Sequence, residues 1–132
     1  MKQLYSGGSI SFGTDPEFFF SKDGKIIGSE KVLPEEGLKY NPSEDDKTNG
    51  RSTSVGDSDS KIVRDGVQAE LNPRPNTCRA NLINEIGVCF RKLSRSIKDT
   101  KVDFSNLIRM TQEEMDELSE KSKVFGCMPS TN

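Results

Sequence analysis

The chain has 132 residues, of which 31% are hydrophobic and 30% charged, and 19 Lys and Arg against 21 Asp and Glu give a net charge of −2. This length fits one domain with a lean core, and the near-balanced charge gives no basic footprint for nucleic acid or an anionic membrane. No apolar run is long enough to span a bilayer, and the N-terminus lacks the apolar stretch of a signal peptide, so we expect a soluble intracellular protein.

The first predicted element is a β-hairpin in "PEFFFSKDGKIIGS", with strands over residues 17–21 and 25–28. Asp23 and Gly24 stand between the two runs, and this dipeptide tolerates the positive φ angles of a type I′ turn. Alternation along the first strand places Phe18 and Phe20 on one face and Glu17 on the other. An ionised Glu17 beside three phenylalanines needs a partner.

Residues 30–60 change in character and are rich in Pro, Gly, Ser, Asp and Lys. The composition predicts a long polar loop, which is uncommon within a compact domain. Two interpretations stay open, a mobile solvated insertion and a lid that covers a substrate. The segment offers few apolar anchors, namely Val32, Leu33, Leu38, Tyr40 and Val55.

A second strand is predicted in "KIVRDGVQAELNPRP". Val67, Ala69 and Leu71 alternate with polar residues, which is typical of a half-buried strand with one polar face. Pro73 and Pro75 end the strand because neither can donate a hydrogen bond to a neighbouring strand.

A long helix follows, with Asn76 or Thr77 as its predicted N-cap. Its apolar residues recur at helical spacing and predict a face packed on the core: Leu82, Ile83, Ile86, Cys89, Phe90, Leu93 and Ile97.

The C-terminal part is predicted to hold a strand in "KVDFSNLIRM", a short helix in "TQEEMDELSEKS" and a final strand over Lys123–Cys127. Thr111 and Glu114 have the spacing of a capping box at the start of the short helix. Strands interrupted by two helices predict an α+β fold, an antiparallel sheet with helices packed on one face, as a single domain over residues 1–132. The other face of such a sheet is open to solvent or to a ligand.

The cysteine and histidine content limits the possible chemistry. Cys78, Cys89 and Cys127 have no C-x-x-C spacing, which favours reduced cysteines over a disulfide framework or a zinc site. The absence of histidine excludes Ser-His-Asp and Cys-His catalytic sites. Any catalysis must therefore use carboxylates, Lys or Arg, and a bound metal would be a hard cation such as Mg²⁺ held by oxygen atoms.

Two of the predicted strands carry a carboxylate on their polar sides, Glu17 and Glu70. If these strands are neighbours, both carboxylates project from one open face, where Gln68 and Asn72 extend the polar row. Paired carboxylates repel each other unless a proton or a cation lies between them, and Mg²⁺ is a suitable cation. The alternative is that both are ordinary solvent-facing residues. Likewise, the arginines around this strand are either an anion clamp or ordinary surface residues: Arg64, Arg74 and Arg79.

Three motifs in order resemble one family. "FGTDPEFFF", "RDGVQAELNPRP" and "KVFGCMPS" are similar to segments of the phage carboxylate–amine ligases of type two, amidoligases related to the glutamine-synthetase superfamily. The likeness extends from Phe12 to Pro129. It implies part of a glutamine-synthetase-like catalytic domain and ATP-dependent amide bond formation through an acyl phosphate.

The resemblance also implies a site. Glu17 and Glu70 would be the catalytic metal ligands, Asp15 a further metal ligand, and Arg74 and Arg64 the cofactor-binding residues near the phosphates of ATP. The implied cofactors are Mg²⁺ and ATP, and the substrates are a carboxylate and an amine on small molecules or peptides. The implied location is the cytoplasm of an infected cell or the virion, with no nucleic acid or membrane partner.

The chain also departs from the family pattern. Family members continue into a G-G-H-x-H segment, whereas this chain ends at "STN", has no histidine, and places Met128 where an acidic residue is usual. We therefore expect an incomplete domain with little or no ligase activity on its own. It would be a truncated product, a fragment completed by a second chain, or a non-catalytic phage structural or interaction protein that keeps part of the fold.

Overall fold

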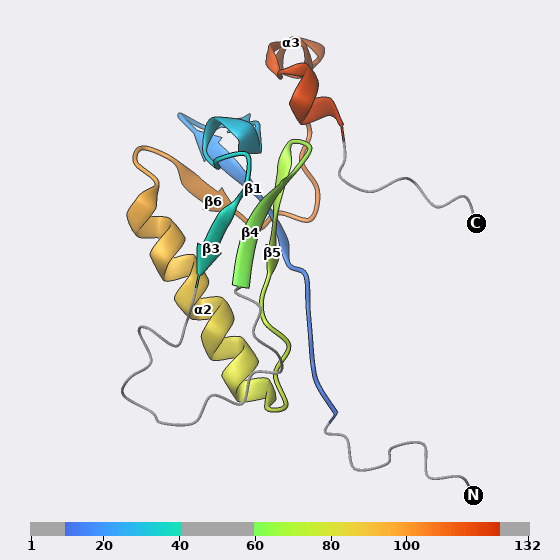
Figure 1. Ribbon diagram of the computed structural model, residues 1–132. Coiled ribbons are helices and arrows are strands. Elements are labelled where there is room, and N and C mark those ends of the chain that lie inside the picture. The colour runs from blue at the N-terminus through green and yellow to red at the C-terminus, as the bar shows by residue number, and fades with distance from the viewer. Residues whose placement is uncertain (1–9, 41–59, 125–132) are drawn as a thin grey trace, which may run out of the picture.

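The computed structural model describes residues 10–40 and 60–124, and these form an α+β fold around a six-stranded antiparallel sheet (Figure 1). The strands run in the order β2-β1-β5-β4-β3, and β6 also pairs with β1. Their bounds are β1 (Glu17–Lys22), β2 (Lys25–Ile27), β3 (Leu38–Tyr40), β4 (Ser60–Asp65), β5 (Gln68–Asn72) and β6 (Lys101–Asp103). The helix α2 (Arg79–Ser96) lies along one face of the sheet, and α3 (Gln112–Glu117) lies at the end where β4 turns into β5.

The hairpin of β1 and β2 is confirmed, with a register that pairs Lys22 with Lys25. Asp23 and Gly24 have φ angles of 51° and 80°, the left-handed values that a type I′ turn requires. The first strand is one residue longer than predicted and the second one residue shorter.

The prediction of a loop over residues 30–60 is wrong for its first part. Residues 29–31 form the short 3₁₀ helix η1 (Ser29–Lys31), and β3 pairs with β4 through Leu38 opposite Ile62. Leu33 and Tyr40 are buried in the core. The burial of Leu33 and Tyr40 and the pairing of β3 with the edge of β4 order this segment although most of its residues are polar. The question of a lid or a mobile insertion falls on residues 41–59, outside the described residues.

The strands β4 and β5 form a second hairpin, in which Asp65 pairs with Gln68. Gly66 has a φ of 59° and occupies the first turn position, where type II′ turns place glycine. The half-buried character predicted for this strand is confirmed over Gln68–Asn72, where Ala69 and Leu71 are buried and the alternating residues are partly exposed. The prediction is wrong at Val67, which lies in the turn and is only partly buried. The strand β4 was not predicted.

The long helix is confirmed, but its N-cap is not the predicted one. Cys78 is the N-cap and makes no side-chain cap bond, while the Asn76 side chain accepts a hydrogen bond from the Cys78 backbone N–H at 3.1 Å. This local turn delays the helix until Arg79. The prediction that Ile83 packs on the core is also wrong, since Ile83 is 68% exposed. The sheet covers only a narrow stripe of α2, and Ile83 lies beside that stripe.

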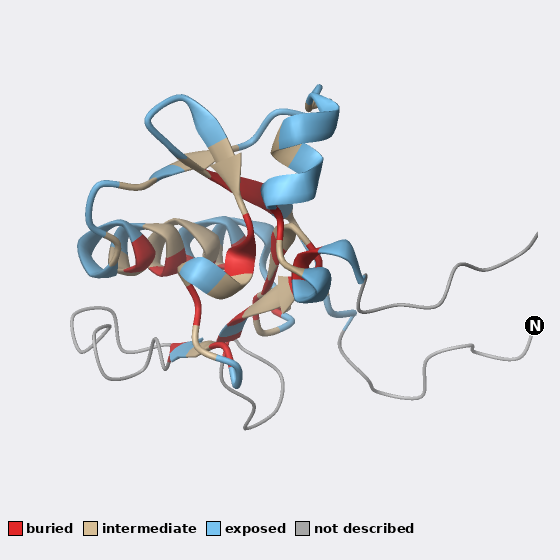
Figure 2. Cartoon of the chain, turned by 90° about the horizontal axis from the view of Figure 1, so that it is seen from above, coloured by how far each residue is buried: buried red, intermediate tan, exposed pale blue. Residues whose placement is uncertain are grey.

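The core lies between α2 and one face of the sheet. Phe18 of β1 packs edge-to-face on Phe20 and on Phe90 of α2, with ring centroids 5.4 and 5.1 Å apart. Figure 2 shows the buried residues gathered where α2 meets the sheet, whereas α3 is mostly exposed. The buried cluster comprises Phe18, Phe20, Leu33, Tyr40, Ile62, Ala69, Leu71, Cys89 and Leu93.

The predictions for the C-terminal part are confirmed only in part. The strand expected in "KVDFSNLIRM" ends at Asp103, as β6, and Leu107 beyond it is 76% exposed. The capping box of Thr111 and Glu114 at α3 is confirmed. The predicted final strand is wrong at its first two residues, because Lys123 closes the 3₁₀ helix η2 (Glu120–Lys123) and Val124 is its C-cap. Residues 125–127 lie outside the described residues.

Among the described residues, none of the helices combines the length and the apolar character needed to cross a bilayer.

Candidate functional site

The two predicted carboxylates meet across the sheet. The strands β1 and β5 pair in an antiparallel register that sets Glu17 directly opposite Glu70 and Phe18 opposite Ala69. Residues directly opposite each other share a face, with Cβ atoms about 4.5–5.5 Å apart. Because Phe18 and Ala69 are buried against α2, Glu17 and Glu70 project from the other face. The burial of Phe18 and Ala69 on the core face holds in place the strand backbone from which both carboxylates project.

The same register places further polar groups beside the pair. The Gln68 side chain donates a hydrogen bond from Nε2 to Oε2 of Glu17 at 3.2 Å. Asp65 of β4 is opposite Gln68 and therefore shares this face. Glu17 thus has one neutral donor beside it and a second carboxylate directly across.

The electrostatics of this face show that the carboxylates are crowded. The pKa of Glu70 is raised above its usual value, first by partial burial and then by the negative charges of Asp15, Asp65 and Glu17. A hydrogen bond with the Asn72 side chain acts in the opposite direction but does not cancel these effects. A proton or a cation would therefore be stabilised at Glu70.

The donor set permits a hydrated divalent cation. Glu17 and Glu70 supply hard oxygen ligands, and Mg²⁺ commonly binds one or two carboxylates while retaining several waters. Within residues 10–40 and 60–124, no group of three or more His, Cys, Asp or Glu side chains is gathered closely enough to hold a metal. Asp15 accordingly acts on Glu70 through its charge, and water would complete the coordination.

The two predicted phosphate-binding arginines lie elsewhere. Arg64 is opposite Ala69, which places it on the core face, and its guanidinium donates to the Leu33 carbonyl oxygen, with Nε at 2.9 Å. Arg74 forms an ion pair with Glu85 of α2, with Nε 3.1 Å from Oε1. The sheet thus separates both guanidinium groups from Glu17 and Glu70, and the predicted clamp is not assembled with the carboxylates. Arg79 lies over the Phe12 ring, 5.0 Å from its centroid.

The ion pair of Arg74 belongs to a buried polar cluster that was not predicted from the sequence. The Ser60 hydroxyl donates to the Glu85 carboxylate and also accepts a hydrogen bond from the Arg74 backbone N–H at 3.0 Å. Glu85 is only 5% exposed. Its position offered a signal, because it lies three residues after Leu82 and four before Cys89, within the buried stripe of α2.

Replacing Glu70 with glutamine is expected to stabilise the chain at neutral pH. Since folding raises the pKa of Glu70, the folded state favours the protonated side chain, and that contribution is lost as the pH rises through the folded pKa. Glu70→Gln should therefore raise the free energy of unfolding at pH 7, by at most about 1 kcal/mol because the site is solvated. The difference should shrink as the pH falls through the folded pKa and close at about pH 3, below the usual pKa of glutamate, where both states are protonated.

Urea denaturation at both pH values measures this effect. Glu36→Gln is the matched control, because it makes the same substitution at an exposed glutamate outside the pair, and it should change stability by less than about 0.5 kcal/mol. A loss of stability in Glu70→Gln at pH 7 would contradict the repulsion between Glu70 and the neighbouring carboxylates.

Comparison of the chain with known protein families, with curated protein sequences and with solved structures gives no match. The paired carboxylates and the ordered sequence motifs are therefore the basis for a functional proposal.

Proposed function

We propose that the chain carries part of the catalytic domain of an ATP-dependent carboxylate–amine ligase, and that Glu17 and Glu70 hold its Mg²⁺ ion. The observation that carries this proposal is the register that sets Glu17 opposite Glu70 on the open face of an antiparallel sheet. A glutamine-synthetase-like domain also presents carboxylates from such a face. The substrates would be a carboxylate and an amine on small molecules or peptides.

Three polar side chains on this face have separate roles in the proposed site. Glu17 and Glu70 bind the cation, and Gln68 orients the Glu17 carboxylate through its hydrogen bond. The bound metal would neutralise charge on the phosphates of ATP. Arg64 and Arg74 make no phosphate contact at this site, because the sheet separates their guanidinium groups from Glu17 and Glu70.

Removing either carboxylate is expected to weaken binding of a divalent cation at least about tenfold, because it removes one of two protein ligands. Mn²⁺ is the probe, since it is paramagnetic and broadens the NMR signals of nearby amides. Wild type should show broadening centred on Glu17 and Glu70, and Glu17→Gln and Glu70→Gln should each reduce it. Glu36→Gln is the control. Broadening that is centred elsewhere, or that all three variants reduce equally, would contradict the site.

The isolated chain is expected to show little or no ATP-dependent ligation, because Arg64 and Arg74, the two predicted phosphate-binding arginines, lie across the sheet from Glu17 and Glu70. Positioned metals and cations supply most of the rate in phosphoryl transfer. The measurement is ATP hydrolysis with Mg²⁺ and candidate amines. Substantial wild-type turnover that Glu17→Gln and Glu70→Gln both abolish would overturn this expectation and show a complete enzyme.

A second candidate function, a non-catalytic interaction protein, is favoured by one observation. Phe104 and Leu107 follow β6 closely and are 56% and 76% exposed. A partner chain that completes the sheet or covers this segment would bury them. Size-exclusion chromatography with light scattering tests self-association, and a monomer at high concentration would argue against a second copy as that partner.

A further inference from the structure

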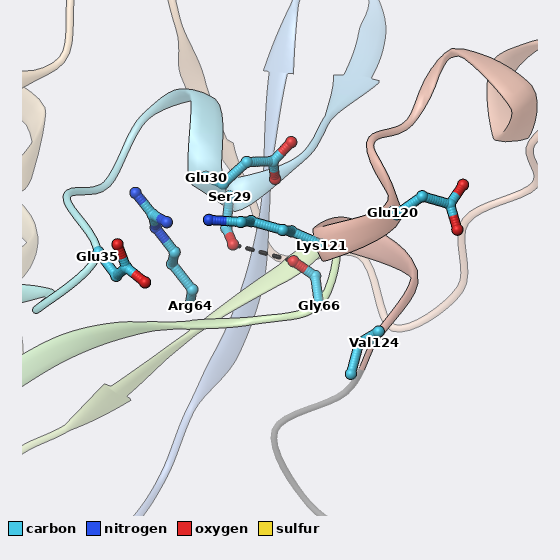
Figure 3. Close-up of a pocket in the computed structure, with 8 residues that line it drawn as sticks. All are labelled: Ser29, Glu30, Glu35, Arg64, Gly66, Glu120, Lys121 and Val124. Atoms are coloured by element: carbon cyan, nitrogen blue, oxygen red, sulfur yellow. Dashed lines mark hydrogen bonds between the residues drawn. The ribbon is translucent and has the colours of Figure 1, made fainter.

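A pocket of about 530 Å³ lies where the β4–β5 turn meets η1 and η2 (Figure 3). Pockets of about 300–1,000 Å³ are typical of small-molecule sites. The lining residues come from η1, from the connection before β3, from the β4–β5 hairpin and from η2. Neither Glu17 nor Glu70 lines the pocket, so it is distinct from the candidate metal site.

Two cationic side chains reach into this pocket. The guanidinium of Arg64 is held in place by the Leu33 carbonyl oxygen, which accepts hydrogen bonds from Nε and Nη2. The side chain of Lys121 extends from η2 across the pocket towards Arg64 (Figure 3). The ion pairs found among the described residues involve neither of these two cations. An anionic group placed between them would therefore meet two positive charges.

Three glutamates also line the pocket, but they are not equivalent. Glu120 forms an ion pair with Lys123 at 2.8 Å and points away from the pocket centre (Figure 3). The carboxylate of Glu30 accepts hydrogen bonds from the hydroxyls of Ser119, at 2.7 Å, and Ser122. Burial raises the pKa of Glu30, but these hydrogen bonds outweigh it and lower the pKa, so Glu30 stays ionised. Glu35 stands at the pocket edge beside Arg64 (Figure 3).

We propose that this pocket binds a free α-amino acid with an apolar side chain. Its carboxylate lies between Arg64 and Lys121, its ammonium group meets Glu35, and its side chain extends over the Lys121 side chain in the direction of Val124 (Figure 3). Both charges of the ligand then have an opposite charge beside them, as charge-assisted hydrogen bonds require. Apart from Glu120, which points away and is paired with Lys123, two carboxylates face two cations, so a nucleoside triphosphate would bring excess negative charge whereas a zwitterion adds no net charge.

NMR titration with three related molecules tests whether the pocket requires both the ammonium and the carboxylate of an amino acid. L-leucine carries both charged groups, 4-methylpentanoate lacks the ammonium and isopentylamine lacks the carboxylate. Leucine is expected to shift the amide signals of Ser29 and Gly66 saturably, and each analogue to bind at least about tenfold more weakly. Absence of saturable shifts with leucine would overturn the site, and equal binding of 4-methylpentanoate would overturn the amino-acid ligand.

Matched variants test the named side chains. Lys121→Gln is expected to weaken leucine binding about five- to tenfold, since it removes one partially solvated charge from the carboxylate. Lys98→Gln, at an exposed lysine that does not line the pocket, should leave it unchanged. Glu35→Gln and Glu36→Gln form a second such pair on the ammonium side. If the two variants of either pair weakened leucine binding equally, the proposed contact of that lysine or glutamate with the ligand would be overturned.

Discussion

Glu85→Ala is expected to lower the free energy of unfolding by about 3–5 kcal/mol, the usual cost of breaking a buried ion pair from one side. The side chains of Arg74 and Glu85 are only 10% and 6% exposed. Without the carboxylate, the Arg74 guanidinium has lost its buried counter-charge, and the Ser60 hydroxyl has lost its acceptor. Small domains are stable by only about 5–15 kcal/mol, so much of the total would be lost. Urea denaturation followed by circular dichroism measures the change.

Two comparisons separate this effect from a general loss of contacts. Replacing Arg74 and Glu85 together with methionine should cost less than Glu85→Ala, because no charge is then left buried alone. Lys25→Ala removes an ion pair with Glu117 whose side chains are 60% and 69% exposed, and should change stability by less than about 1 kcal/mol. A Glu85→Ala effect no larger than that of Lys25→Ala would contradict the importance of the buried pair.

Phe20→Ala is expected to destabilise the chain by about 3–5 kcal/mol, as other large-to-small changes at buried aromatics do. Phe20 is 0% exposed and packs edge-to-face on Phe18. Its removal therefore leaves a cavity between β1 and α2 that the rigid sheet cannot close. Thermal or urea unfolding measures the loss.

The exposed Ile83 on α2 provides the control for this substitution. Ile83→Ala removes apolar atoms from a side chain that is 68% exposed, and should change stability by less than about 1 kcal/mol. Phe20→Leu should fall between the two, because most of the buried volume is kept. Similar effects of Phe20→Ala and Ile83→Ala would show that the core is not where the structure places it.

The features that the sequence predicts well are those set by neighbouring residues. The turn of Asp23 and Gly24, the alternation of β5 and the capping box of Thr111 each depend on a few adjacent side chains. The shared face of Glu17 and Glu70 required more. Alternation predicts that each carboxylate points away from the core, but only the register of β1 on β5 sets them opposite each other.

The features that the sequence misses depend on tertiary contacts. The strand β3 forms from a polar segment because the edge of β4 is available to pair with it. The spacing of Glu85 from Leu82 and Cys89 places it within the buried stripe of α2, but its partners come from elsewhere, Ser60 from β4 and Arg74 from the connection before α2. Arg64 and Arg74 lie close in sequence to Glu70, yet the sheet places their guanidinium groups on its other face.

The strand β1 has consequences for the order of events during synthesis. Phe20 pairs with Ile27 of the adjacent hairpin strand and also with Val102, a residue made much later. Contacts between distant residues form slowly, because a long chain segment must close before they gain any free energy. The central strand therefore cannot acquire its last partner until Asp103 has left the ribosome. Until then one edge of β1 lacks part of its pairing and remains available to chaperones and to aggregation, even though α2, which covers Phe18, is made earlier.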